Sequence, residues 1–410
     1  MTHQWGNSKR TCPIFGRNDP FGPCQGDTDT PRSGPSISAM GAPPSLELSP
    51  RQARRIAVRA QLLSSPRPHD VLDVVRHLGF LQVDLTRVVA EHADLALWTR
   101  LGSGYEPEDL ETLVGNGALV ELRAMLLPGE DVALHRADMD GWPGEPPLKQ
   151  WQEDLADWVG ANDGCRRDIL ALLRAEGPTA ARDLPDTCEV PWRSSGWTND
   201  KNVMKLLECM EARGEVAVAS REGRERRWDL AERIHPGDAP VPAEEAHRIL
   251  AARRLEALGI ARPRALEAWD ERYDVRGTGA AARIDGVRGL WRVDPARLDD
   301  LDDFEGRTAI LSPLDRLVFD RKRMEDLFAF DYQLEMYKPA AKRQWGYWAM
   351  PVLDRDELVG KVDATADREA GVLIVDAVHE DGDWSAARRR RVHGQLDALG
   401  EWLGLEVARA

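Results

Sequence analysis

The spacing of apolar residues predicts helices through most of the region from residue 45 to residue 160. Ser49 and Pro50 form a helix start, because serine caps the first turn and proline suits its first position. A second helical pattern runs over 71–78 and ends at Gly79. The pattern next predicts one short β-branched extended segment and two further helices, over 80–89, 90–100 and 106–114. Helices around one brief strand are typical of a winged-helix-like unit, and the Trp- and Pro-rich stretch 138–151 predicts a linker.

Residues 161–236 carry the clearest local pattern in the chain. The pattern predicts a helix, a short helix capped by Thr179, a longer helix and two β-rich runs around a turn, over 165–177, 180–186, 198–214 and 215–234. Three helices followed by a hairpin are the element order of a winged helix. In that motif the third helix usually enters a DNA groove while the hairpin touches the backbone.

The last two regions differ from each other in kind. Residues 237–303 predict a third winged-helix-like unit, with helices at 242–259 and 265–273 and a wing at 286–294, and the acidic stretch 298–306 marks its end. Residues 304–410 predict a β-rich domain closed by a helix at about 388–404, with alternating aromatic and β-branched segments at 328–337, 344–353, 358–367 and 371–380.

The predicted fold class is therefore α+β, with tandem winged-helix domains followed by a β-rich C-terminal domain. The boundaries expected for its parts are 45–160, 161–236, 237–303 and 304–410. Residues 1–44 are rich in Gly, Pro, Ser and Thr and show no apolar periodicity, so we expect a disordered N-terminal tail.

Composition narrows the function classes. The 410 residues carry a formal charge of -15, which argues against a general polyanion binder, so any nucleic-acid site must be a local basic patch. No window approaches the roughly 18 consecutive apolar residues of a membrane span, and no secretory signal precedes the first helix, so we expect a cytoplasmic protein.

Several kinds of catalytic and binding site have no support in the sequence. The five cysteines are odd in number and far apart, which predicts neither a disulfide framework nor a zinc or redox pair. No phosphate-binding loop or zinc-protease motif is present, and the scattered histidines are interpreted as structural. We therefore expect no metal, no nucleotide cofactor and no other cofactor.

Gln82, Val83 and Asp84 form the most informative tripeptide. In an extended segment the side chains alternate, so Gln82 and Asp84 would project from one face while Val83 anchors in the core. Such a pair can hold a water, with Asp84 accepting its proton or stabilising a cation and Gln82 fixing its orientation. A surface strand with two solvated polar groups is the alternative.

Basic residues gather in two places. The first is the predicted hairpin and the start of the helix before it, where helix N-termini and arginines suit phosphate oxygens; its candidates are Lys201, Asn202, Lys205, Arg221, Arg224, Arg226 and Arg227. The second lies among aromatic residues of the C-terminal region, and its candidates are Arg321, Arg323, Lys338 and Arg343. A solvated hairpin or interdomain contact explains the first group equally simply, and ion pairs over a β core explain the second.

Four stretches of the chain together resemble a known family. ARRIAVRAQLL, LGFLQVDLTRVVAEHADLALWTRLG, LVGKVDATADREAGVL and above all ILSPLDRLVFDRKRMEDLFAFDYQLEMYKPAAKRQWGYWAMPVL are similar to the winged-helix DNA glycosylases of the AlkZ and YcaQ type. The resemblance covers about residues 46–405 and is weaker through 235–300. Members carry a Gln-apolar-Gln or Gln-apolar-Asp catalytic motif, and Gln82-Val83-Asp84 matches the second form. One departure is visible in ALVELRAMLLP, which has no histidine where many members have one.

The resemblance implies a monofunctional DNA glycosylase that hydrolyses the N-glycosidic bond of N7-alkylated purines, including bulky or crosslinked N7-alkylguanine. Its partner would be double-stranded DNA, its product an abasic site in base excision repair, and its benefit self-resistance to a genotoxic natural product. We expect a monomer. The alternatives from other classes are a winged-helix transcriptional regulator without catalysis and a scaffold protein that uses winged helices for protein contacts.

Overall fold

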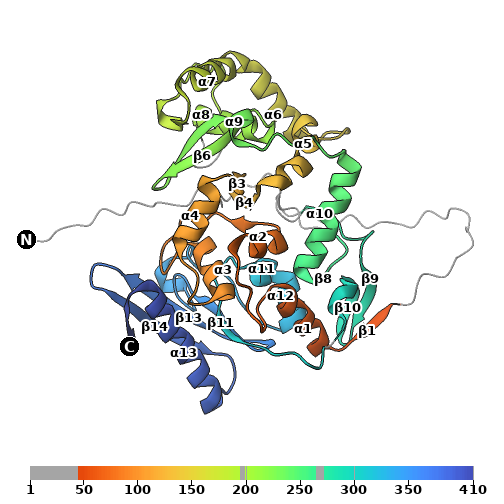
Figure 1. Ribbon diagram of the computed structural model, residues 1–410, viewed down its shortest axis with the longest axis vertical. Coiled ribbons are helices and arrows are strands. Elements are labelled where there is room, and N and C mark those ends of the chain that lie inside the picture. The colour runs from red at the N-terminus through yellow and green to blue at the C-terminus, as the bar shows by residue number, and fades with distance from the viewer. Residues whose placement is uncertain (1–44, 194–198, 200, 265–271, 300, 410) are drawn as a thin grey trace, which may run out of the picture. The chain divides into compact units, whose positions relative to one another are not determined.

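The computed structural model describes residues 45–193, 199, 201–264, 272–299 and 301–409 (Figure 1). The predicted tail, 1–44, and most of the helix predicted at 265–273 lie outside the described residues. Contacts divide the chain into two compact units, 138–234 and 45–137 with 235–409, and the division falls within helix α5 (Val132–Asp140). The predicted second winged-helix region lies in the smaller unit, apart from its last two residues, and most of the other three regions share the larger one.

The smaller unit confirms the main helices and the hairpin expected for 161–236. Its helices are α6 (Gln150–Ala161), α7 (Asp163–Glu176), α8 (Asn202–Ala212) and α9 (Ala231–Ile234). Strands β6 (Val216–Glu222) and β7 (Glu225–Leu230) form the hairpin, and β5 (Thr179–Ala180) pairs antiparallel with β7. The expected helix after Thr179 is wrong, because Thr179 belongs to β5 and only a 3-10 turn, Ala181–Asp183, follows it.

The larger unit begins with four helices whose ends follow the sequence signals. They are α1 (Pro50–Ala60), α2 (Val71–Leu78), α3 (His92–Leu101) and α4 (Pro107–Gly115). Ser49 caps α1 in a capping box with Gln52, Asp70 caps α2, and Gly79 ends α2 with φ +84°. A small antiparallel sheet in the order β2-β4-β3 accompanies them, from β2 (Leu81–Gln82), β3 (Leu119–Leu122) and β4 (Met125–Pro128).

A second sheet joins the start of the larger unit to its middle. The strand order is β1-β9-β10-β8, from β1 (Leu46–Leu48), β8 (Ile260–Ala261), β9 (Ala280–Ile284) and β10 (Val287–Val293). β1 runs parallel to β9, so the N-terminal strand completes the hairpin expected near 286–294. Helix α10 (Ala243–Leu258) precedes this sheet, and Trp291 shares a buried core with Ile56 of α1.

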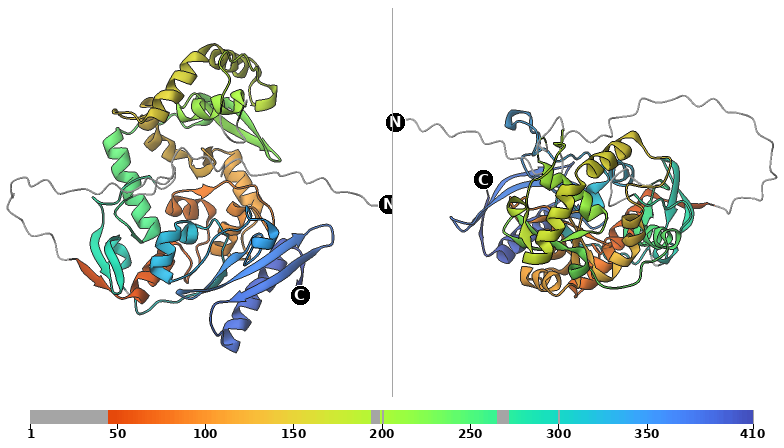
Figure 2. Two further views of the ribbon diagram at one scale, coloured as in Figure 1. Left: turned by 180° about the vertical axis from the view of Figure 1, so that it is seen from behind. Right: turned by 90° about the horizontal axis from the view of Figure 1, so that it is seen from above.

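The C-terminal region is β-rich, as expected, and a long helix covers its sheet. The sheet has the order β11-β12-β13-β14-β15, from β11 (Thr308–Ile310), β12 (Met350–Asp354), β13 (Glu357–Asp367), β14 (Val372–Glu380) and β15 (Glu406–Arg409). Helix α13 (Ala386–Leu403) lies along one face of this sheet (Figure 2) and buries Val392, Leu396 and Leu399. Arg388 and Arg391 fasten it to the buried carboxylate of Asp354.

The strand expected at 328–337 is wrong. Helices α11 (Arg316–Phe319) and α12 (Arg321–Phe328) occupy the segment before it, and α12 ends at Ala329 in a left-handed conformation. Phe330 and Tyr332 are two positions apart, and both rings enter the core. Tyr332 packs near Trp345 and donates a hydrogen bond to the carbonyl of Ala349. This spacing resembles a strand although no neighbouring strand pairs with the segment.

The architecture is mixed α+β, and residues from distant parts of the chain share its cores. Val74 and Leu97 of the N-terminal helices belong to the same buried cluster as Val362 and Leu396 of the C-terminal region. Within the described residues, no helix is long and apolar enough to cross a membrane.

Gly259 and Gly404 each end a helix with φ near +67°, but only Gly259 lies where α10 closely approaches α1. We therefore expect alanine to destabilise the protein more at Gly259 than at Gly404. A Cβ at Gly259 would lie 2.6 Å from Cβ of Ala60 and 2.8 Å from the carbonyl oxygen of Ile56, whereas one at Gly404 meets nothing within 4 Å. Gly404→Ala should therefore lower the free energy of unfolding by about 1 kcal/mol from backbone strain alone. Gly259→Ala should lower it by roughly 3 kcal/mol, because overpacking adds to that strain. Urea denaturation of both variants checks this, and equal losses would contradict the packing.

Candidate functional site

Gln82 and Asp84 lie at the end of β2, beside a hairpin. Leu81 and Gln82 pair with Leu126 and Met125 of β4, and the Val83 amide donates to the carbonyl of Ala124 at 2.7 Å. The strand is shorter than the predicted 80–89, because pairing with β4 stops there. Gln82 and Asp84 are each only 4% exposed, so the alternative of two solvated polar groups is wrong.

Gln82 lines a small buried cavity. The cavity measures about 20 Å³, room for about one water, and its polar lining comes from Gln82, His92, Arg100, Asp315 and Arg316. Among the described residues the Gln82 side-chain amide has no hydrogen-bond partner, so its donor and its acceptor are both available to a molecule in the cavity. An amide in this state can orient a water.

Asp84 lies next to this cavity without lining it. Its carboxylate accepts a hydrogen bond from the Thr86 amide at 2.8 Å, the local turn that aspartate commonly forms. The negative charge of Asp84 nevertheless acts on the ring of His92, where it favours the protonated form. The structure thus brings the amide, the imidazole and the carboxylate into one neighbourhood.

His92 is the residue of the site that the sequence alone did not reveal. It begins α3, is 3% exposed, and its Nδ1 lies 2.8 Å from the Ser312 hydroxyl. Burial lowers the pKa of His92 to about 4, against the opposing charges of Asp315 and Asp84. The ring is therefore neutral at pH 7, and with Nδ1 engaged by Ser312 its Nε2 is left to serve the cavity. Only its position at the start of a predicted helix could have suggested it.

A buried ion pair holds the wall of the cavity. Arg100 and Asp315 are 1% and 0% exposed, and two guanidinium nitrogens lie 2.7 and 3.2 Å from the carboxylate oxygens. Although burial would raise it, the charge and hydrogen bonds of Arg100 hold the pKa of Asp315 below its usual value. Arg100 also donates to the backbone carbonyl of Gln61 at 2.9 Å, so its donors are well used.

A second cavity, of about 50 Å³, shares Phe80 and Arg316 with the first. The Arg316 guanidinium stacks over the Phe80 ring at 4.5 Å, and the rest of the polar lining is Asp131, His135, Arg253, Arg254 and Tyr273. Three arginines share this lining, but Arg253 forms an ion pair with Asp131 there and Arg254 is buried, so part of the positive charge is already engaged within the protein. These arginines come from α10 and α11, up to more than 60 positions apart, so no local pattern in the sequence brings them together.

The predicted DNA-contact residues of the smaller unit divide into exposed and engaged side chains. Lys201 and Arg224 are exposed. Arg221 is half-buried, Lys205 pairs with Glu208, Arg226 lies over the Trp228 ring and Arg227 pairs with Glu222 at 2.7 Å. Asn202 donates to Asp186 and accepts from the Trp192 amide, so its side chain holds a loop.

The C-terminal candidates are engaged in local structure. Arg323 is 1% exposed and its guanidinium donates to the carbonyls of Ile260 and Leu258, so this prediction of a DNA contact is corrected to a packing role. Arg321 donates to the carbonyls of Val318 and Pro313. Lys338 pairs with buried Glu335, and Arg343 donates to the carbonyl of Lys338 while lying over the exposed ring of Tyr347.

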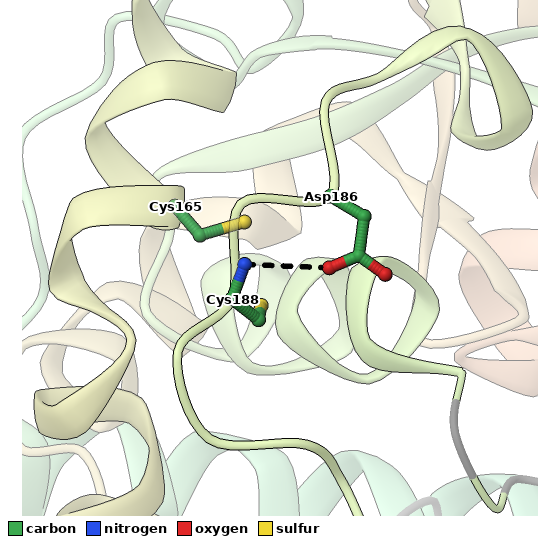
Figure 3. Close-up of side chains that lie close together, drawn as sticks. All are labelled: Cys165, Asp186 and Cys188. Atoms are coloured by element: carbon green, nitrogen blue, oxygen red, sulfur yellow. Dashed lines mark hydrogen bonds between the residues drawn. The ribbon is translucent and has the colours of Figure 1, made fainter.

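Two of the cysteines that the sequence separates are close together in the structure. The sulfur atoms of Cys165 and Cys188 and a carboxylate oxygen of Asp186 all lie within 4.8 Å of one another (Figure 3). The spacing along the chain did not predict this proximity, because folding brings together two cysteines that are separated by 22 residues.

Known proteins are similar to this chain over most of its length. The model of the DNA glycosylase AlkZ-like family matches residues 75–402, a range that includes Gln82, Asp84 and His92. Among solved structures, the DNA glycosylase AlkZ of Streptomyces sahachiroi is similar to this chain, with a TM-score of 0.55 and 16% sequence identity over 89% of this chain and 100% of that one. At that identity the structural match shows a shared fold.

The neutral state of His92 predicts a pH dependence of stability. Its pKa is about 4 in the folded chain against 6.5 ordinarily, so between these values the unfolded chain binds more protons and stability falls as pH falls. The full loss from this one group is about 3 kcal/mol. Denaturation curves between pH 7 and pH 4 should show a steeper loss for the native chain than for His92→Asn. His235, whose pKa burial also lowers to about 4, is a background common to both, and equal slopes would contradict the assignment.

Proposed function

Since this chain belongs to the AlkZ-like DNA glycosylase family, we propose that it hydrolyses the N-glycosidic bond of N7-alkylated purines in double-stranded DNA. The observation that carries the proposal is the unpartnered amide of Gln82 in a one-water cavity, with the Asp84 carboxylate and the neutral His92 beside it. The product is an abasic site for base excision repair.

The substrate chemistry suits groups of this kind. Alkylation at N7 leaves a positively charged purine that departs without a strong general acid. The sugar then develops oxocarbenium character, which a carboxylate stabilises, and a fixed charge of this kind is commonly worth a few kcal/mol. We assign that role to Asp84, whose carboxylate lies beside the cavity that Gln82 lines. Gln82 orients the water through its free donor and acceptor.

His92 has a positioning role in this scheme. Its neutral ring contacts the Ser312 hydroxyl through Nδ1 and lines the same cavity as Gln82, so we propose that its second nitrogen helps to hold the water. A cationic imidazole there would repel both the developing sugar cation and the alkylated base. Burial, which keeps the ring neutral, therefore serves the reaction as well as the fold.

The linings of the two cavities also bear on the type of glycosylase. Lysine is absent among the described residues that line them, so no amine is placed to form a Schiff base with the sugar, and we infer a monofunctional enzyme. Both cavities are far smaller than the roughly 300 Å³ at which ligand pockets begin. The alkylated base would therefore remain outside them, whatever the size of its adduct. As the family resemblance implies, we propose that the substrates include bulky or crosslinked N7-alkylguanine and that the enzyme gives self-resistance to a genotoxic natural product. We propose that the enzyme acts as a monomer in the cytoplasm.

In the smaller unit, helix α7, strand β5, a 3-10 turn, helix α8 and the β6–β7 hairpin follow one another. We propose that they form a winged helix, with the 3-10 turn in place of the second helix, and that α8 and the hairpin contact the DNA backbone. Lys201 directly precedes α8, and Arg224 lies in the turn between β6 and β7. Both side chains are exposed, which makes them the strongest candidates. Lys205, Arg221, Arg226 and Arg227 are secondary ones. In the larger unit we place Arg321, Lys338 and Arg343 at lower priority, since each is bound to its own neighbours.

Replacing Asp84 should separate catalysis from binding. Asp84→Asn keeps the shape and removes the charge, so single-turnover base release should fall by about 100-fold or more while DNA affinity is unchanged. The assay uses a duplex containing N7-methylguanine or a bulky N7 adduct, with alkali revealing abasic sites. Asp73→Asn, on the exposed face of α2, is the matched control and should keep full activity.

The opposite outcomes are equally informative. Loss of affinity without loss of single-turnover rate in Asp84→Asn would overturn its catalytic role. A native chain that releases no base from several adducts, yet binds one DNA sequence tightly, would instead be the regulator considered above.

The hairpin predicts a graded salt dependence. Arg224 is exposed and forms no ion pair within the described chain, so Arg224→Ala should weaken DNA binding and reduce the slope of log K against log salt by about 1. Arg227→Ala should have a smaller effect, because Glu222 already neutralises that guanidinium at 2.7 Å. Fluorescence anisotropy at several salt concentrations measures both. Glu222→Gln is the complementary control and should strengthen binding; unchanged slopes in all three variants would remove the hairpin from the interface.

A further inference from the structure

Cys165, Asp186 and Cys188 form a compact donor set that the proposed reaction does not use. Cys165 lies in α7, whereas Asp186 and Cys188 lie in the loop between the 3-10 turn and α8. One ligand atom of each residue lies within 4.8 Å of the other two, and Figure 3 shows both sulfur atoms and the carboxylate in one group.

We propose that these three residues bind one Zn²⁺ ion, with a water as the fourth ligand. Two thiolates and a carboxylate are donors that zinc takes in tetrahedral sites, and soft sulfur ligands select against the hard cations Mg²⁺ and Ca²⁺. Three protein ligands with one open position are the usual composition of a zinc site that keeps a water.

Hydrogen bonds from neighbouring residues already orient the Asp186 carboxylate. Asn202, the first residue of α8, donates its side-chain amide to both oxygens of Asp186, at 3.2 and 3.1 Å. The amide of Cys188 donates to the same carboxylate at 3.4 Å. Partners of this kind orient a ligating carboxylate and raise metal affinity. A bound ion would join α7, the loop and the start of α8.

The three proposed ligands differ in their exposure to solvent, which leaves a path by which an ion can enter the site. Cys165 is 1% exposed and its thiol donates to the carbonyl of Pro185 at 3.5 Å, Cys188 is half-buried, and Asp186 is exposed. The ion would enter from the side of Asp186 and reach the buried sulfur last.

Zinc takes cysteine as the thiolate, so binding displaces protons and the affinity should rise with pH.

The test uses the full chain, reduced and stripped of metal, titrated first with Co²⁺ and then with Zn²⁺. We expect one equivalent of Co²⁺ with the absorption of a tetrahedral site and of cobalt–thiolate bonds, and its displacement by Zn²⁺. Cys188→Ser should abolish the thiolate signal of the pair, and Asn202→Ala should weaken affinity by about 10- to 100-fold. Cys209→Ser, a buried cysteine of the same unit outside the cluster, is the matched control and should bind normally.

The proposal fails if the native chain binds no Co²⁺ or Zn²⁺, or if Cys188→Ser binds as well as Cys209→Ser. It also fails if the two cysteines are found only as a disulfide that forms under hydrogen peroxide while the reduced pair takes no ion. Cys188 is half-buried, so its serine variant is expected to fold, and its thermal melting without metal verifies this. None of these readouts depends on glycosylase activity. Failure of the zinc proposal would therefore leave the proposed function unaffected, and failure of the proposed function would leave the zinc proposal unaffected.

Discussion

The buried ion pair between Arg100 and Asp315 fixes the geometry on which the candidate site depends. Neither charge reaches solvent, and both engage through two nitrogen–oxygen contacts. Breaking such a pair by removing one partner typically costs about 3–5 kcal/mol, because the remaining charge stays buried. Helix α3 and the turn before α11 therefore cannot separate easily, and this holds His92 within hydrogen-bond distance of Ser312.

Burial then decides the chemistry that the site can offer. A solvated histidine would carry charge in mildly acid conditions, but His92 is neutral because the core disfavours its cation. The same exclusion of water leaves the Gln82 amide free for a single bound molecule. Positive charge lies at the same place. Arg316, which stacks on Phe80, lines both cavities, whereas the charge of Arg100 in the first cavity is paired with Asp315.

Local signals predicted the helices well, and they failed where a distant partner was needed. The start of α1 at Pro50, the end of α2 at Gly79 and the C-terminal helix α13 follow from caps and periodicity within a few residues. The segment 328–337 alternates like a strand because two aromatic rings enter the core, yet no strand pairs with it. Arg323 looked like a DNA contact by composition, but packing of α12 against β8 buries it.

The sequence by itself determined the helices, the hairpin of the smaller unit and the Gln82-Val83-Asp84 motif, because each is encoded by neighbouring residues. Only the tertiary structure decided that His92 meets Ser312, 220 positions later, and that Cys165 meets Cys188. The physical reason is that a hydrogen bond between neighbours depends on local backbone conformation, whereas desolvation depends on every segment that packs around a group. Whether a histidine is neutral, an amide unpartnered or an arginine buried is settled only when those segments come together.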